Sequence, residues 1–193
     1  MQQGSTGSRF GLGARFGSYS ASGWDTTAYT LPLNYSYGFE NGNTLILDSP
    51  FTLVDTAGGQ SYSGSIGAGL TVPLRLGLPD WVNWSLTPMA RFGAVGSVEL
   101  GAVGGMWSLS LTSNLDLRIA DKTTLTIGNM VGHLQTVPIT IQDYDISYNL
   151  KNTIFRNGLV LTRGIGEVFG RPASASVFAV DTRFTGDALY VNS

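Results

Sequence analysis

His133 is the single histidine of the chain, and any serine hydrolase chemistry would depend on it. A Ser–His–acid site needs an imidazole that accepts the proton of the serine nucleophile. His133 lies in the stretch NMVGHLQ, where no serine or acidic partner falls at a recognisable position. We therefore expect an interfacial or loop histidine without a catalytic role. A lipid-modifying enzyme that uses His133 stays open as an alternative.

Metal and phosphate sites have little support in the residue types. Cysteine is absent, so a metal site would have to be built from carboxylates and one histidine. The acidic stretch DYDISYN at 143–149 offers oxygen ligands for a hard cation, but it lacks the order of an EF-hand loop. The glycine-rich stretches GLGARFG and GAVGGM open no helix that could bind a phosphate. We predict no metal site and no cofactor.

Composition limits the class of protein further. Charged residues make up 12% of the 193 residues, roughly half the share usual in soluble domains. The net charge of −2 offers no basic surface for nucleic acid, so we expect no nucleic-acid partner. No apolar run approaches the length of a membrane-spanning helix. The amino end has neither the basic nor the apolar region of a signal peptide.

The elements that must position any site are strands. In WSLSLTSNLDLRIADKTTLTIG, at 107–128, apolar and polar residues alternate from Trp107 to Ile119, where Ser113 is the one polar residue on the apolar phase. A turn at ADK follows, and the pattern resumes with Leu125 and Ile127. This pattern predicts a long strand with one apolar and one polar face. Similar alternation recurs along the chain without helical periodicity or a linker. ENGN at 40–43 predicts a hairpin turn. We expect a single domain over residues 1–193.

Arginines favour one orientation of these strands. The phase opposite the large apolar side chains is rich in arginine, glycine, serine and threonine, while the whole chain has two lysines. A narrow barrel interior favours small residues and arginines paired with carboxylates. The predicted fold class is therefore all-β, an antiparallel up-and-down transmembrane β-barrel of about 10–12 strands. The residues predicted to face its lumen are Arg9, Arg15, Arg75, Arg91, Asp116, Arg118, Arg156, Asp181 and Arg183.

Tryptophans lie near predicted strand ends. In a membrane barrel, tryptophan and tyrosine form girdles at the two lipid–water interfaces. The girdle candidates are Trp24, Trp81, Trp84 and Trp107. The alternative is that they are ordinary strand aromatics that fill a core.

The second half of the chain resembles a known family. The stretches LTIGNMVGHLQTVP, NGLVLTRGIG and VFAVDTRFTGDALYVNS are similar to the solitary autotransporter-type barrel domains of the Gram-negative outer membrane. The resemblance covers roughly residues 81–193 and is clearest at DTRFTGDALYV. It implies a barrel of about twelve antiparallel strands in the outer membrane. We therefore expect outer-membrane lipid and the barrel assembly machinery as partners, and a structural, anchoring or transport role without catalysis. It implies no active site, and the oligomeric state stays open.

The carboxyl end departs from that pattern. Outer-membrane barrels usually end in a strand whose last residue is aromatic, whereas this sequence ends in YVNS. We expect that a last strand, like the signal peptide, is missing from this sequence. A soluble all-β structural protein, such as a virion or filament subunit, explains both ends without missing segments and remains the alternative from another class.

Overall fold

The computed structural model describes residues 6–21, 24–56, 59–97, 102–137, 139–141, 144–146, 151–168 and 170–186. Every regular element in these ranges is a β-strand. The strands are β1 (Gly7–Leu12), β2 (Arg15–Ala21), β3 (Trp24–Gly38), β4 (Thr44–Thr56), β5 (Gly59–Pro73), β6 (Val82–Ser97), β7 (Ala102–Ala120), β8 (Thr123–Val137), β9 (Ile139–Ile141), β10 (Tyr144–Ile146), β11 (Lys151–Val168) and β12 (Arg171–Gly186). No helix able to cross a membrane occurs in this part of the chain.

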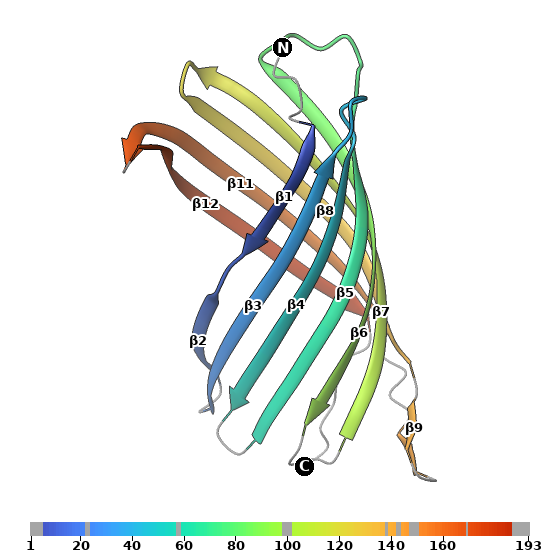
Figure 1. The fold of residues 1–193 in the computed structure, drawn as a ribbon. Helices are drawn as coiled ribbons and strands as arrows, with labels where there is room; N and C mark the ends of the chain where they lie inside the picture. The colour runs from blue at the N-terminus through green and yellow to red at the C-terminus, as the bar shows by residue number, and fades with distance from the viewer. Residues whose placement is uncertain are drawn as a thin grey trace.

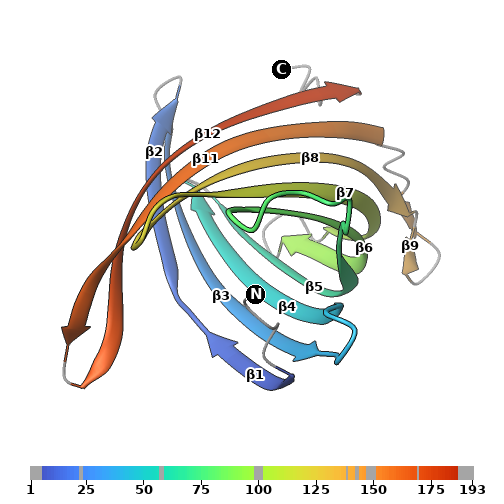
Figure 2. The same ribbon diagram turned by 90° about the horizontal axis from the view of Figure 1, so that it is seen from above.

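The strands form one up-and-down antiparallel sheet. Ten of them form one sheet. Nine pair in the order β1-β3-β4-β5-β6-β7-β8-β11-β12, and the tenth, β2, pairs with the first half of β3, from Trp24 to Thr30. β9 and β10 form a separate small hairpin. Figures 1 and 2 show the sheet curling into a half-barrel. Within the described residues no ladder joins β12 to β1 or β2, so both edges of the sheet are unpaired. The prediction of an all-β up-and-down fold is confirmed.

Turn chemistry explains the β3–β4 connection. Gly42 has a φ of 87°, a left-handed conformation that glycine adopts without steric cost. The Asn41 side chain accepts a hydrogen bond from the backbone N–H of Asn43 at 3.0 Å. This is the hairpin turn expected from the Asn-Gly pair in ENGN.

Ladder register divides the side chains between two faces. Asp48, Gly67 and Arg91 are directly opposite one another on β4, β5 and β6, so they share one face. The other face carries the row Pro88, Leu111, Val131 and Phe155. Thr26, Gly67 and Thr87, which are buried, lie on the first face. Because side chains converge inside a curl and diverge outside it, this first face is the concave one.

The sheet has no hydrophobic core. Among the described residues no hydrophobic side chain is buried, and many of the large ones on the convex face, such as Ile66, Phe92 and Leu109, are exposed. The accessible surface of 13680 Å² exceeds the roughly 8,800 Å² expected for a compact chain of this mass. A single curled sheet therefore leaves its apolar face uncovered.

Candidate functional site: the polar concave face

An ion pair crosses the middle of the concave face. Arg91 Nε donates to Asp48 Oδ1 at 3.1 Å, and Arg91 Nη2 forms a salt bridge with Asp48 Oδ2. The carboxylate is 11% exposed and the guanidinium side chain 39% exposed. This two-point geometry is the stronger form of an arginine–carboxylate contact. The pair joins β4 to β6, although β5 lies between them.

Gly67 on β5 makes room for this pair. A Cβ atom at this position would lie 2.2 Å from Asp48 Oδ1 and 2.6 Å from Arg91 Cγ. Both distances are far shorter than van der Waals contact, so any side chain at position 67 would displace the ion pair. The three residues therefore form one unit, in which the glycine on β5 lets its two neighbouring strands connect.

Hydroxyl pairs line other parts of the concave face. Thr71 and Thr87 are hydrogen-bonded at 2.8 Å, and Thr87 is buried. Thr30 and Thr52 are bonded at 3.0 Å on the first strands of the sheet. Asp116 accepts a hydrogen bond from Thr126 Oγ1 at 2.6 Å. These contacts hold neighbouring strands together.

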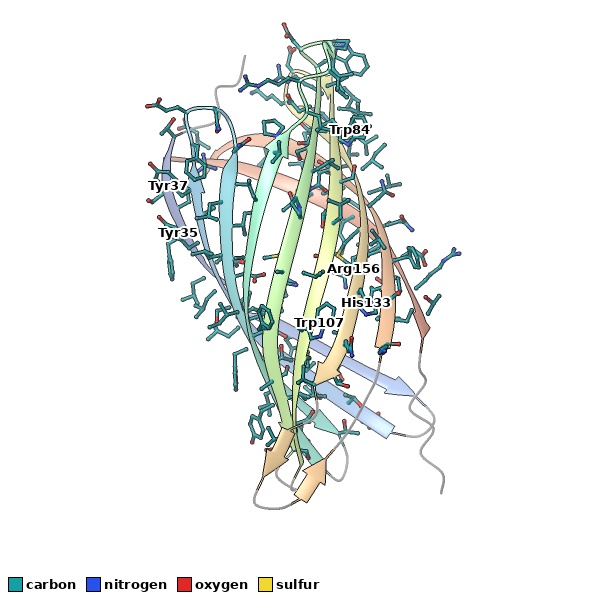
Figure 3. The ribbon with its side chains drawn as sticks, turned by 90° about the vertical axis from the view of Figure 1, so that its right-hand side faces the viewer. Tyr35, Tyr37, Trp84, Trp107, His133 and Arg156 are labelled. Atoms are coloured by element: carbon teal, nitrogen blue, oxygen red, sulfur yellow. The ribbon has the colours of Figure 1, made fainter. Side chains whose placement is uncertain are left out.

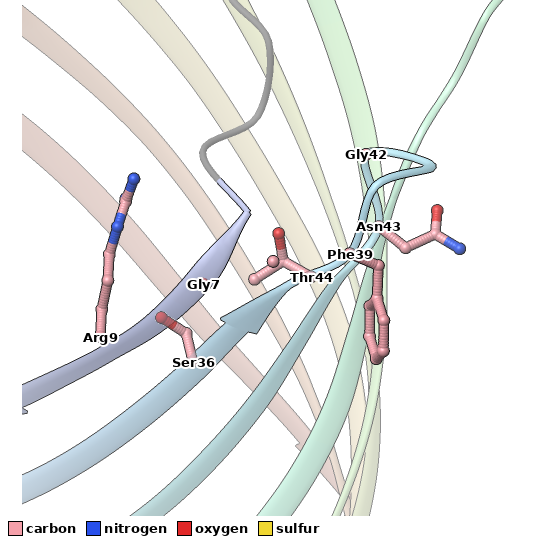
Figure 4. A pocket seen from close by; sticks show the side chains of 8 residues that line it. Gly7, Arg9, Ser36, Phe39, Gly42, Asn43 and Thr44 are labelled. Atoms are coloured by element: carbon pink, nitrogen blue, oxygen red, sulfur yellow. The ribbon is translucent and has the colours of Figure 1, made fainter.

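Most of the predicted arginines lie on the concave face. By ladder register the residues on this face are Arg9, Arg15, Arg91, Asp116, Arg118 and Arg156. Arg9 lines a cavity of about 140 Å³ at the upper end of β1, β3 and β4, together with Ser36, Phe39 and Thr44 (Figure 4). Of these predicted residues, the structure pairs Arg91 with a carboxylate, and that carboxylate, Asp48, was not among the candidates.

Three predicted lumen residues lie elsewhere and require correction. Arg75 follows the end of β5 and donates from Nη2 to the backbone carbonyl of Asn41, so it lies in the connection to β6 at the rim. Asp181 is opposite Asn157, and Arg183 is opposite Phe155, which places both on the convex face. The hydrogen bond from Arg183 Nε to Asp181 Oδ2, 3.0 Å long, is formed there.

On β12, unlike on the neighbouring strands, most of the large apolar side chains lie on the concave face. Phe178, Val180 and Phe184 of β12 are opposite Val160, Gly158 and Ile154, on the concave face. They stay exposed there, at 73%, 55% and 67%. The prediction followed hydrophobicity along β12, whereas the pairing with β11 decides the face, and a shift of one residue exchanges the faces of a whole strand.

Aromatic side chains lie at both ends of the convex face. Trp84 Nε1 donates to Ser113 Oγ at 2.8 Å, which gives the polar break in β7 a partner. Trp107 contacts His133 with ring centroids 5.6 Å apart, nearer the other end of the strands (Figure 3). Trp81 is exposed beside the start of β6. Of Trp24 only the backbone is described, at the first position of β3.

The structure places His133 on β8, with its side chain on the convex face. It lies opposite Leu109 on one side and Thr153 on the other. In the described ranges no hydrogen bond from His133 to a serine or a carboxylate is found, and no group of three metal-ligating side chains occurs. Most of the acidic stretch 143–149 lies outside the described residues, with only the backbone of Tyr144–Ile146 seen as β10.

Asp48 and Gly67 are the site residues that sequence reasoning missed. A signal existed for Asp48, because Leu45, Leu47 and Leu53 alternate around it and leave it on the polar phase. Nothing in the local sequence distinguishes Gly67 from Gly69, which is also on the concave face of β5. The role of Gly67 depends on Asp48 and Arg91, whose side chains meet above it from the two neighbouring strands.

The described residues form a curled, antiparallel up-and-down sheet with an apolar convex face and a polar concave face. This fold is that of an autotransporter β domain. The chain is similar to the crystal structure of the beta domain of the Bordetella autotransporter BrkA, with a TM-score of 0.62. The match covers 93% of this chain and 79% of that chain at 15% sequence identity. No family model and no curated protein matches the sequence.

Proposed function

We propose that this chain is a membrane-embedded β domain of the Gram-negative outer membrane, of the autotransporter translocator type. Its convex face contacts lipid, and its concave face lines a polar lumen. Its role is to anchor or pass another segment rather than to catalyse a reaction. The barrel assembly machinery is the partner expected for its insertion.

One observation carries this proposal. In the described part of the chain no hydrophobic side chain is buried, yet the convex face carries large apolar residues such as Leu111, Val131 and Phe155. A water-soluble sheet packs such a face into a core, whereas an outer-membrane barrel presents it to lipid. The fold shared with an autotransporter β domain supports the same assignment.

The spacing of the tryptophans agrees with a lipid-facing band. Trp84 is opposite position 115 of β7, and Trp107 lies on the same strand, so the two levels are about 26 Å apart at roughly 3.3 Å per residue. With strands tilted by about 40°, the height along the membrane normal is about 20 Å, close to the roughly 25 Å of such bands. We therefore propose Trp84 and Trp107 as members of opposite interfacial girdles.

Refolding into lipid vesicles tests the proposal. The purified chain should float with the vesicles and should migrate differently on a gel before and after boiling. A chain that stays in the aqueous phase as a soluble assembly would show that the alternative, a soluble structural subunit, is correct.

The non-catalytic role needs its own test. The vesicle-bound protein should show no phospholipase or lipid A deacylase activity above a heat-denatured control. Activity that disappears in His133→Ala, with flotation retained, would establish the lipid-modifying alternative.

A further inference from the structure

Polar side chains form a row across the convex face of the last three strands of the sheet. Asn129 on β8 is directly opposite Asn157 on β11, which is directly opposite Asp181 on β12. All three are exposed. We call these three residues the convex polar row.

Apolar residues flank the row along the strands. On β8, Ile127 and Val131 lie on either side of Asn129 on the same face, and on β11, Phe155 and Leu159 flank Asn157. The row therefore interrupts an apolar surface and is not a rim of that surface. No hydrogen bond to either amide is found among the described residues.

In lipid this row is unfavourable. The argument rests on the proposed function, in which the convex face lies in the membrane. Hydrocarbon offers no hydrogen-bond partners, so polar side chains in membrane segments normally face protein or water. Asn129 and Asn157 would face acyl chains unless protein covers them.

The side chains on the convex face of β12 also favour contact with protein over contact with lipid. It carries Asp181 and Arg183, joined by a hydrogen bond of 3.0 Å, together with the small residues Ala175 and Ala179. Val177 is the large apolar residue on this face, while Phe178, Val180 and Phe184 face the concave side. A polar, small-residue surface is what packed membrane segments present to each other, since small side chains allow close approach and polar ones form hydrogen bonds.

We propose that the convex polar row is the interface with a second copy of this chain, related by a two-fold axis along the membrane normal. The membrane holds both copies in one orientation and at one depth, so each row meets its own counterpart. An asparagine amide both donates and accepts hydrogen bonds, which makes the Asn157 side chains of two copies complementary. On either side of the axis an Asn129 amide faces the end of the row that carries a carboxylate, which accepts its N–H.

Disulfide cross-linking in vesicles tests this interface, because the chain has no cysteine of its own. Asn157→Cys should give a disulfide-linked dimer under mild oxidation. The matched control is Ala68→Cys, which is exposed on the convex face of β5 and lies away from the row. We expect at least about fivefold more dimer for Asn157→Cys. Equal cross-linking of the two variants, or none for Asn157→Cys, overturns the proposal.

A second measurement does not depend on a cysteine at the interface. The double variant Asn129→Leu and Asn157→Leu makes the row apolar and suits it to lipid. Energy transfer between labelled copies should show self-association about threefold to tenfold weaker than in the parent. Unchanged association overturns the interface.

Flotation separates this inference from the proposed function. A protein that floats with vesicles and remains monomeric contradicts the interface alone. A protein that does not float contradicts the membrane assignment and the interface with it.

Discussion

Arg91 on β6 binds Asp48 on β4 through two hydrogen bonds that pass over Gly67 on the strand between them. The ion pair thus links strands that share no ladder. The concave face is stabilised at this point by side chains as well as by backbone pairing. Three residues far apart in the sequence act together, and each can be tested separately.

Substituting the glycine should disturb the pair. Gly67→Ala places a Cβ against both partners, and we expect a loss of about 1–3 kcal/mol in the free energy of unfolding, as for overpacked sites. The measurement is urea denaturation of the vesicle-bound protein. Gly158→Ala is the control, since a Cβ there meets its nearest neighbours at 3.7 Å. A similar loss in both variants would contradict the special role of Gly67.

The losses in the free energy of unfolding caused by removing Asp48 and Arg91 should be non-additive. Asp48→Ala leaves a partly buried guanidinium without its carboxylate, and Arg91→Ala leaves a carboxylate that is mostly buried. Each single change should destabilise by about 1–3 kcal/mol. The double variant should lose less than the sum, with a coupling of about 0.5–3 kcal/mol. Strict additivity in the denaturation cycle would mean that the ion pair contributes nothing.

The two faces of β7 should differ in their response to charge. Leu111 lies on the convex face, and Thr112 is opposite Thr87 on the concave face. Leu111→Arg should cost about 2–4 kcal/mol near the bilayer midplane, while Thr112→Arg, facing a polar lumen, should cost clearly less. Refolding yield and denaturation in vesicles report the difference. Equal losses would argue against a lipid-facing convex surface.

Shortening the same leucine should leave no cavity. Leu111 is 45% exposed, so lipid would fill the space that Leu111→Ala vacates. We expect a loss of about 1.5–3 kcal/mol or less, the transfer contribution alone. A loss above about 4 kcal/mol, in the upper range for buried core sites, would indicate that the leucine is packed in a protein core.

The bond between Trp84 and Ser113 should stabilise the convex face. Ser113→Ala leaves the indole N–H without its partner, and we expect a loss of about 0.5–1.5 kcal/mol. Ser110→Ala, on the concave face of the same strand, serves as the control and should change stability less. Trp84→Phe combined with Ser113→Ala should be no worse than the more damaging single change, as measured by unfolding in vesicles.

Alternation in the sequence was sufficient to predict strands such as β7, because a two-residue period in hydrophobicity can be satisfied only by an extended strand between two environments. β7 follows its predicted pattern from Trp107 to Ile119, and the β3–β4 turn lies at the predicted Asn-Gly pair. The all-β, up-and-down character follows from the same local signals and the short turns. These features depend on residues that are neighbours in the chain.

Tertiary structure alone decided the features that depend on strands far apart in the sequence. Arg91 and Asp48 are 43 positions apart, and no local pattern indicates that Gly67 would lie beneath their contact. Asp181 and Arg183 were predicted to face the lumen because they lie on the phase opposite the apolar residues of the same stretch, Phe178, Val180 and Phe184. The pairing of β12 with β11 places them on the convex face. The physical reason is that hydrophobic alternation separates two faces of a strand, whereas hydrogen-bond register with its neighbours determines which face is which.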